Sequence, residues 1–164
     1  MPLHPDFREM LCALFDEDVE FLLVGAMAVA AHGYGRATGD MDILVRPSPD
    51  NARRVMQSLR KFGAPLHGLT VRDLSTPGRV FQMGVPPWRI DILTSIEGVT
   101  FEDAWPNRFL KNTDGLEMPV ISRADLIRNK KTVARLQDLA DVARLEGKSD
   151  RRVRKPSPRR RRRP

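Results

Sequence analysis

Short apolar runs alternate with amphipathic segments along the chain, and the two periodicities predict an α/β (or α+β) protein. Apolar runs of strand length predict strands at 19–24, 41–46, 80–85 and 88–93, and a hairpin from 109–111 and 116–121. Apolar residues at helical spacing predict helices at 5–18, 26–32, 49–62, 100–105, 123–131 and 135–146. Residues 69–73 are expected to form a short strand or a loop. The pattern leaves the direction of each strand open.

The end of the chain differs in composition from the rest. Residues 151–164 contain nine of the 28 Lys and Arg residues and no acid, so 19 basic residues face 21 acidic ones in 1–150. The net charge of +7 therefore belongs to the tail. We divide the chain into a domain at 1–148 and an Arg/Pro-rich tail at 149–164, which is expected to be disordered. Such a tail can bind RNA or DNA phosphates, and an extension without a role is the alternative.

The sequence predicts a cytoplasmic protein that makes no contact with a membrane. No run of about 18 apolar residues is present. The first ten residues, MPLHPDFREM, lack the basic segment and apolar core of a signal peptide. Cys12 is the single cysteine, so it forms no internal disulfide, and we expect it to be a small buried hydrophobe. These features fit a reducing compartment.

Two acids, Asp40 and Asp42, open the strand predicted at 41–46. Their side chains point to the same side of an extended strand, while Met41 and its alternate neighbours point into the core. Adjacent carboxylates repel each other, so such a pair is kept mainly to bind a divalent cation or to share a proton. A solvated strand end is the alternative. Asp91 interrupts another apolar strand, and three carboxylates on neighbouring strands can bind two Mg²⁺ ions about 3.5–4 Å apart.

A glycine stands at the end of the first predicted strand, before the acidic pair. Gly25 follows the apolar run at 19–24, and a side chain there would block the close approach of a ligand or of a second backbone. Backbone amides near Gly25 can hold phosphate oxygens. The order of strand, glycine, helix and acidic strand therefore favours a site for metal ions and phosphate groups.

These residues resemble the nucleotidyltransferase superfamily related to DNA polymerase β. Its motif is a strand, a Gly-Gly or Gly-Ser turn, a helix, a strand of the form hDhDh, and a third carboxylate on a later strand. Gly25 matches the turn, Asp40 and Asp42 match the pair, and Asp91 is the candidate for the third position. The resemblance extends over about 19–147 to small bacterial members of the AbiEii type, which often read V-G-G-x-A-V-x-x-H-G-x-x-R-x-T-x-D-x-D.

The resemblance implies a mixed β-sheet flanked by helices and the transfer of an NMP from an NTP to an acceptor hydroxyl. Asp40 and Asp42 would bind two Mg²⁺ (or Mn²⁺) ions. Asp91 would bind the catalytic metal and help to deprotonate the acceptor. The implied acceptor is an RNA such as tRNA, or a protein, and the implied setting is a toxin–antitoxin or defence system.

The resemblance also implies nucleotide contacts from Gly25, Ala26, Arg36 and Lys130, with the two cations placed to meet the triphosphate. A surface arginine and a solvated lysine are the alternatives for Arg36 and Lys130. At 135–141 the matching segment carries an arginine and two aspartates, and helical spacing favours structural ion pairs among them.

Ala26 departs from the motif, in which the second turn residue is Gly or Ser. A serine there would give a hydroxyl to the triphosphate, whereas Ala26 offers only its backbone N–H. This departure motivates an alternative, in which the chain is a catalytically degenerate nucleotidyltransferase fold that acts as a binding or regulatory protein. A further alternative is a nucleic-acid-binding protein that acts through the basic residues at 151–164.

Overall fold

The computed structural model describes residues 2–35 and 38–153, which form a mixed six-stranded sheet with helices on both faces. The strands are β1 (Phe21–Val24), β2 (Asp40–Val45), β3 (Val80–Val85), β4 (Trp88–Leu93), β5 (Phe109–Thr113) and β6 (Leu116–Val120). The helices are α1 (Pro5–Asp16), α2 (Gly25–Ala31), α3 (Pro49–Phe62), α4 (Val71–Leu74), α5 (Phe101–Ala104), α6 (Arg123–Val133) and α7 (Leu136–Val153), with a 3₁₀ turn at Trp105–Asn107. The predicted mixed α/β fold is confirmed.

The strand order across the sheet is β3-β4-β2-β1-β6-β5. β1 runs antiparallel to β2, whereas β2 is parallel to β4 and β1 is parallel to β6. The outer pairs, β3 with β4 and β5 with β6, are antiparallel hairpins. The direction of the strands, which the sequence left open, therefore places the acidic strand β2 between β1 and β4.

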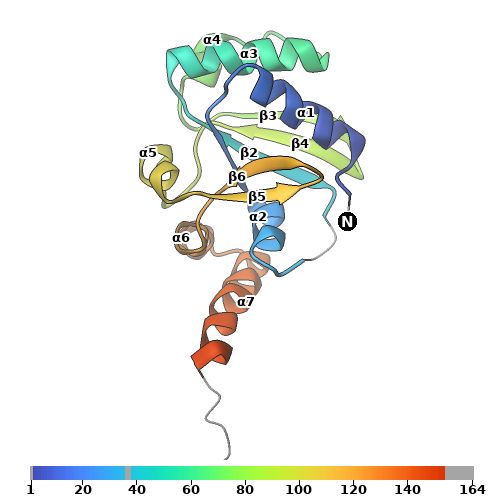
Figure 1. Ribbon diagram of the computed structural model, residues 1–164. Coiled ribbons are helices and arrows are strands. Elements are labelled where there is room, and N and C mark those ends of the chain that lie inside the picture. Colours follow the sequence, from blue (N-terminus) through green and yellow to red (C-terminus); the bar gives the residue numbers. More distant parts are fainter. Residues whose placement is uncertain (1, 36–37, 154–164) are drawn as a thin grey trace, which may run out of the picture.

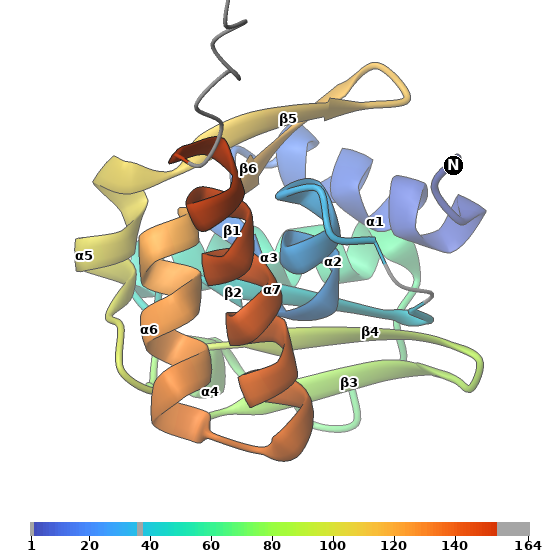
Figure 2. The ribbon, with the colours of Figure 1, turned by 90° about the horizontal axis from the view of Figure 1, so that it is seen from below.

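Helices cover both faces of the sheet (Figures 1 and 2). α1, α3 and α4 lie on one face, and α2, α6 and α7 lie on the other. Because both faces are covered, a central strand can be apolar along its whole length, and all four residues of β1 are buried. In β2 the predicted inward residues are buried as well, and its two incompletely buried positions are Asp40 and Asp42.

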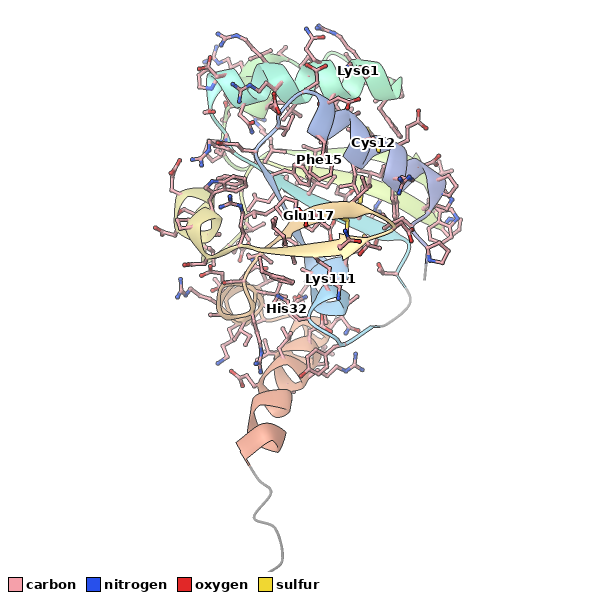
Figure 3. All side chains as sticks on the ribbon, viewed as in Figure 1. Cys12, Phe15, His32, Lys61, Lys111 and Glu117 are labelled. Atoms are coloured by element: carbon pink, nitrogen blue, oxygen red, sulfur yellow. The ribbon has the colours of Figure 1, made fainter. Side chains whose placement is uncertain are left out.

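Three local predictions differ from the structure. Residues 71–74 are helical because Thr70 caps them: its Oγ1 accepts from the N–H of Asp73 at 3.1 Å, and Asp73 Oδ2 accepts from the N–H of Thr70 at 2.9 Å. Cys12 is partly exposed on α1 (Figure 3), because it lies beside the buried stripe of that helix. α7 continues through Gly147, where the sequence predicted its end, because Gly147 has no left-handed backbone that would stop a helix.

The basic tail is only partly within the described residues. α7 reaches Val153, while 154–164, including the run of five arginines, lie outside them. The predicted disorder of the tail and its nucleic-acid binding stay predictions. Among the described helices, none is both long enough and apolar enough to cross a membrane.

Asn51 fixes the start of α3 against the two central strands. Its Oδ1 accepts from the N–H of Glu20 at 2.8 Å, and its Nδ2 donates to the carbonyl oxygens of Glu20 and Arg46, each at 3.0 Å. The side chain is 2% exposed. Asn51 therefore satisfies three backbone groups of Glu20 and Arg46, which flank β1 and β2. It holds these two strands together at the ends that are distant from Asp40 and Asp42.

We expect Asn51→Leu to lower the free energy of unfolding by about 2–4 kcal/mol, because buried backbone groups would lose their partners. Urea unfolding followed by circular dichroism measures the change. Gln57→Ala, at an exposed position of the same helix, is the control and should change stability by less than about 0.5 kcal/mol. Equal effects of the two substitutions would contradict the role assigned to Asn51.

Candidate active site

The three predicted carboxylates lie on neighbouring parallel strands and face one cavity. Asp42 of β2 lies opposite Asp91 of β4 in the register, and Asp40 lies opposite Arg89. Alternation along the strands puts all four side chains on the same face of the sheet. They line a cavity of about 480 Å³, and residues of α6 and α7 contribute to its other wall. The structure thus brings together the residues that the sequence singled out as a cluster.

Gly25 lies against the carboxylate of Asp42. Its φ is +65°, and a Cβ at this position would clash with Asp42 Oδ2. The contact arises because β1 and β2 are antiparallel neighbours, with Val24 opposite Asp42. The sequence predicted a close approach at Gly25 by a ligand or by a second backbone. The approaching group is instead a carboxylate of the chain itself.

The carboxylates carry more negative charge than their neighbours balance. Burial, followed by the charges of Asp91 and Asp40, raises the pKa of Asp42 to about 6, against a weaker opposing effect of Arg89 and Lys130. Burial also raises the pKa of Asp91, although the guanidinium of Arg89 opposes this shift. Burial and like charge both disfavour the ionised form of a carboxyl group. The site therefore favours a proton or a cation near the carboxylates.

Lys130, the predicted triphosphate contact, lines the same cavity but is held by two acids of α7. Its Nζ lies 3.3 Å from Asp138 Oδ1 and 2.9 Å from Asp141 Oδ2, and the residue is 5% exposed. It is thus a buried ion pair rather than the solvated lysine of the alternative. Its contact with a nucleotide stays a prediction.

The ion pairs predicted within 135–141 are confirmed in part and extended. Arg135 Nε lies 2.7 Å from Asp138 Oδ2, so Asp138 of α7 connects Arg135, the residue before that helix, to Lys130 of α6. Arg135 lines the cavity and is mostly exposed, with 77% of its side-chain surface accessible. It is the more accessible of the two cations to an anionic ligand in the cavity. Ala26 lines the cavity too, whereas Arg36, the other predicted cation, lies outside the described residues.

His32, which matches the histidine of the motif, packs away from the cavity. Its Nε2 lies 2.9 Å from the carbonyl oxygen of Ile121, and its ring packs 4.7 Å from that of Phe109 (Figure 3). Burial lowers its pKa. His32 therefore ties α2 to the β5–β6 hairpin.

The carboxylate donors of the cavity fit a hard divalent cation, although Arg89 contacts two of the three acids as they lie in this structure. Carboxylate oxygens are the ligands that Mg²⁺ prefers, and Asp91 Oδ1 is buried without a hydrogen-bond partner. Yet within residues 2–35 and 38–153, no three Asp, Glu, His or Cys side chains are grouped so that they could hold a metal ion. The guanidinium of Arg89 contacts Asp40 and Asp91 instead.

Comparison with known proteins adds evidence on the fold. No protein-family model matches the sequence, and no curated protein does. The solved structure of the lincosamide antibiotic adenylyltransferase LnuA, with lincomycin bound, is similar at a TM-score of 0.57 and 16% identity, over 88% of this chain and 97% of that one. A Thermotoga maritima protein described as a nucleotidyltransferase (TM1012) is similar at a TM-score of 0.51 and 16% identity, over 88% and 91% of the two chains.

This chain has the nucleotidyltransferase fold. The fold that the resemblance implied is therefore confirmed, and the AbiEii type stays a prediction. In the nucleotidyltransferase fold of this chain, the acidic pair lies on β2 and the third acid on β4, as the motif implied. The roles of these residues in binding and catalysis stay predictions.

The sequence did not reveal Arg89 as a residue of the site. It lies two positions before Asp91 on the same strand, so alternation alone places its side chain beside that acid. Asn129, Gln137 and Asp138 also line the cavity, and the sequence did not reveal them because the packing of α6 and α7 against the sheet determines which of their faces reaches the site.

We expect Asp42→Asn to stabilise the metal-free protein above pH 6 and to have little effect near pH 4. The pKa of Asp42 is raised to about 6 from its usual 3.8, so ionised Asp42 destabilises the folded state at high pH and protonated Asp42 does not. The gain should be about 1–3 kcal/mol at pH 8 and below about 1 kcal/mol at pH 4. Urea unfolding in EDTA at both pH values measures it. Asp50→Asn on the exposed start of α3 is the control, and a gain independent of pH would contradict the assignment.

Proposed function

We propose that this protein is a nucleotidyltransferase that moves an NMP from an NTP to an acceptor hydroxyl. The observation that carries the proposal is the convergence of Asp40, Asp42 and Asp91 on one cavity of a nucleotidyltransferase fold. Of the two solved structures compared above, the Thermotoga maritima protein is described as a nucleotidyltransferase and LnuA as an adenylyltransferase. Phosphoryl-group transfer depends mainly on positioning and on charge stabilisation, and the cavity offers groups for both.

Each acid has a distinct role in the proposed reaction. Asp40 and Asp42 hold Mg²⁺ or Mn²⁺, which when bound stabilises the charge that develops on the transferred phosphoryl group. Asp91 would help to hold the cation and would accept the proton of the acceptor hydroxyl. In the protein without a cation, burial raises the pKa of Asp91.

In this proposal the phosphates of the nucleotide bind between the start of α2, next to Asp42, and the start of α7. The backbone N–H of Ala26 and the guanidinium of Arg135 supply hydrogen-bond donors, and charge-assisted bonds to phosphate are among the strongest in proteins. Lys130 lines the cavity behind them, with its charge balanced by Asp138 and Asp141. Arg36 stays a candidate for the same role.

The acceptor that we favour is a small molecule with a hydroxyl group. A cavity of about 480 Å³ is within the range of small-molecule sites. Leu93, Ile96 and Val133 give it an apolar part of its wall, next to the polar groups. LnuA, by its description, acts on a lincosamide antibiotic. The RNA or protein acceptor and the toxin–antitoxin or defence role stay predictions from the resemblance.

A catalytically degenerate regulator is the second candidate, and two observations favour it. Ala26 offers no hydroxyl to a triphosphate, and Arg89 contacts the carboxylates that would bind the metal. In such a protein the guanidinium would stabilise the cavity permanently. The nucleotidyltransferase and the regulator differ in whether a nucleotide enters the cavity.

We expect the wild-type protein to transfer label from an α-labelled NTP in Mg²⁺, and Asp42→Asn to lower the rate at least about 100-fold through loss of charge stabilisation. The acceptor arms are a pool of hydroxylated small molecules, tRNA, and the protein itself. Asp50→Asn is the matched control and should keep full activity. No transfer to any acceptor, or equal transfer by Asp42→Asn, would contradict the proposed reaction.

Ala26→Ser should tighten the binding of a non-hydrolysable NTP analogue with Mg²⁺ by about 3–10-fold, since one new hydrogen bond to a charged phosphate is worth about 1 kcal/mol or more. Isothermal titration calorimetry measures the change. Ala30→Ser, elsewhere on α2, controls for the hydroxyl itself. If neither wild type nor Ala26→Ser binds the analogue, the degenerate regulator gains support over the enzyme.

A further inference from the structure

Arg89 reaches from β4 to two of the three carboxylates of the cavity. Its Nη2 lies 3.5 Å from Asp40 Oδ2, and its Nε lies 3.4 Å from Asp91 Oδ1. The backbone N–H of Arg89 donates to the carbonyl oxygen of Gly39 at 2.8 Å, so the start of the side chain is fixed between β2 and β4. Only 36% of the side chain is exposed. The guanidinium therefore belongs to the cavity wall.

The contact with Asp91 leaves both partners short of hydrogen bonds. Arg89 Nε and Asp91 Oδ1 are buried, and neither has a hydrogen-bond partner among the described residues. The other oxygen of Asp91 accepts a long bond, at 3.5 Å, from Gln82 Nε2, and a side-chain hydrogen bond with Asp42 acts on the same carboxyl group. Buried groups of this kind are costly to leave unsatisfied. The guanidinium thus balances the charge of Asp91 without satisfying the hydrogen bonds of its oxygens. The carboxylate is therefore able to bind another cation.

Arg89 contacts oxygens of two of the acids that would hold a divalent cation. A cation held by Asp40 and Asp91 would lie close to the guanidinium, and like charges at short separations repel each other. The two cations therefore compete for the same acids. Phosphates, however, attract a guanidinium, and Arg89 lines the cavity in which the proposed nucleotide would lie.

We propose that Arg89 is a built-in counterion that competes with the divalent cation for Asp40 and Asp91. The cation alone binds weakly because it must displace the guanidinium without giving it a new partner. A nucleotide supplies that partner, so cation and nucleotide bind cooperatively. Arg89 is in this sense a positioning residue that couples the two ligands. The inference rests on the proposed nucleotidyltransferase function.

The test compares wild-type protein with Arg89→Gln in Mn²⁺ titrations, first alone and then with a non-hydrolysable NTP analogue. Free Mn²⁺ is measured by electron paramagnetic resonance. We expect Arg89→Gln to bind Mn²⁺ alone at least about fivefold more tightly and to bind the analogue with Mn²⁺ at least about fivefold more weakly, the range of ordinary coupling between sites. Arg53→Gln, an exposed arginine of α3 paired with Asp50, removes the same charge elsewhere and should change neither affinity.

The opposite signs of the two changes separate coupling from a structural role, since a damaged site would weaken both. Equal or weaker binding of Mn²⁺ alone by Arg89→Gln overturns the role of Arg89 while leaving the proposed function intact. Absence of Mn²⁺ binding by both proteins, with and without the analogue, overturns the proposed metal site and the role of Arg89 with it.

If circular dichroism shows that Arg89→Gln does not fold, Arg89→Lys replaces it. A lysine keeps the charge but lacks the planar fork that reaches two carboxylates at once. We then expect Mn²⁺ alone to bind at least about twofold more tightly than in wild type, and unchanged binding overturns the role.

Discussion

The repulsion among three carboxylates beside Gly25 is the constraint on which the rest of the site depends. Asp42 fits only because Gly25 has no side chain, and its raised pKa records burial beside Asp91 and Asp40. A fold does not gain stability from such a group, since a buried carboxylate that lacks full compensation is costly. The arrangement is therefore better explained by a ligand that the carboxylates bind than by packing. The sheet supplies the rigid frame, because β1, β2 and β4 are adjacent and covered on both faces.

The helices α6 and α7 place a second group of charged residues beside the cavity. Lys130 is almost fully buried between Asp138 and Asp141, and such a buried ion pair is weak evidence for stability, because desolvation offsets much of the attraction. Its effect is to fix α7 at the cavity wall. Asp138 also holds Arg135, so one acid sets the position of two cations. The helix side of the cavity thus carries two cations paired with two acids, whereas the sheet side carries three acids and Arg89. The proposed nucleotide and its cation would lie between these two sides.

The sequence predicted most of the fold and the acidic half of the site, and the reason is local. Alternation along an extended strand fixes which side chains share a face, so Asp40 and Asp42 could be paired without a structure. Asp91 was grouped with them because it interrupts another apolar strand, and the resemblance gave it the third position of the motif. In the structure, the register of β2 with β4 places it opposite Asp42. The side of the site next to α6 and α7 was harder to predict. Arg135 and Asp138 reach the cavity because α7 packs on α6, and no local sequence pattern predicts that packing. The helix end predicted at Gly147 was wrong because a glycine can also continue a helix.

The contacts of Arg89 bear on whether the protein is an enzyme or a regulator. Its guanidinium neutralises part of the charge of Asp40 and Asp91 in the free protein, which would be sufficient for a protein whose cavity never binds a nucleotide. Yet the contact leaves Asp91 Oδ1 without a hydrogen-bond partner in the part of the chain that the structure describes, and a permanent structural pair would be expected to satisfy it. An ion pair that balances charge but leaves hydrogen bonds unmade suits a group that moves when a better ligand arrives. This incomplete pairing favours the enzyme, because the competing ligands it implies are a divalent cation for the acids and a phosphate for the guanidinium.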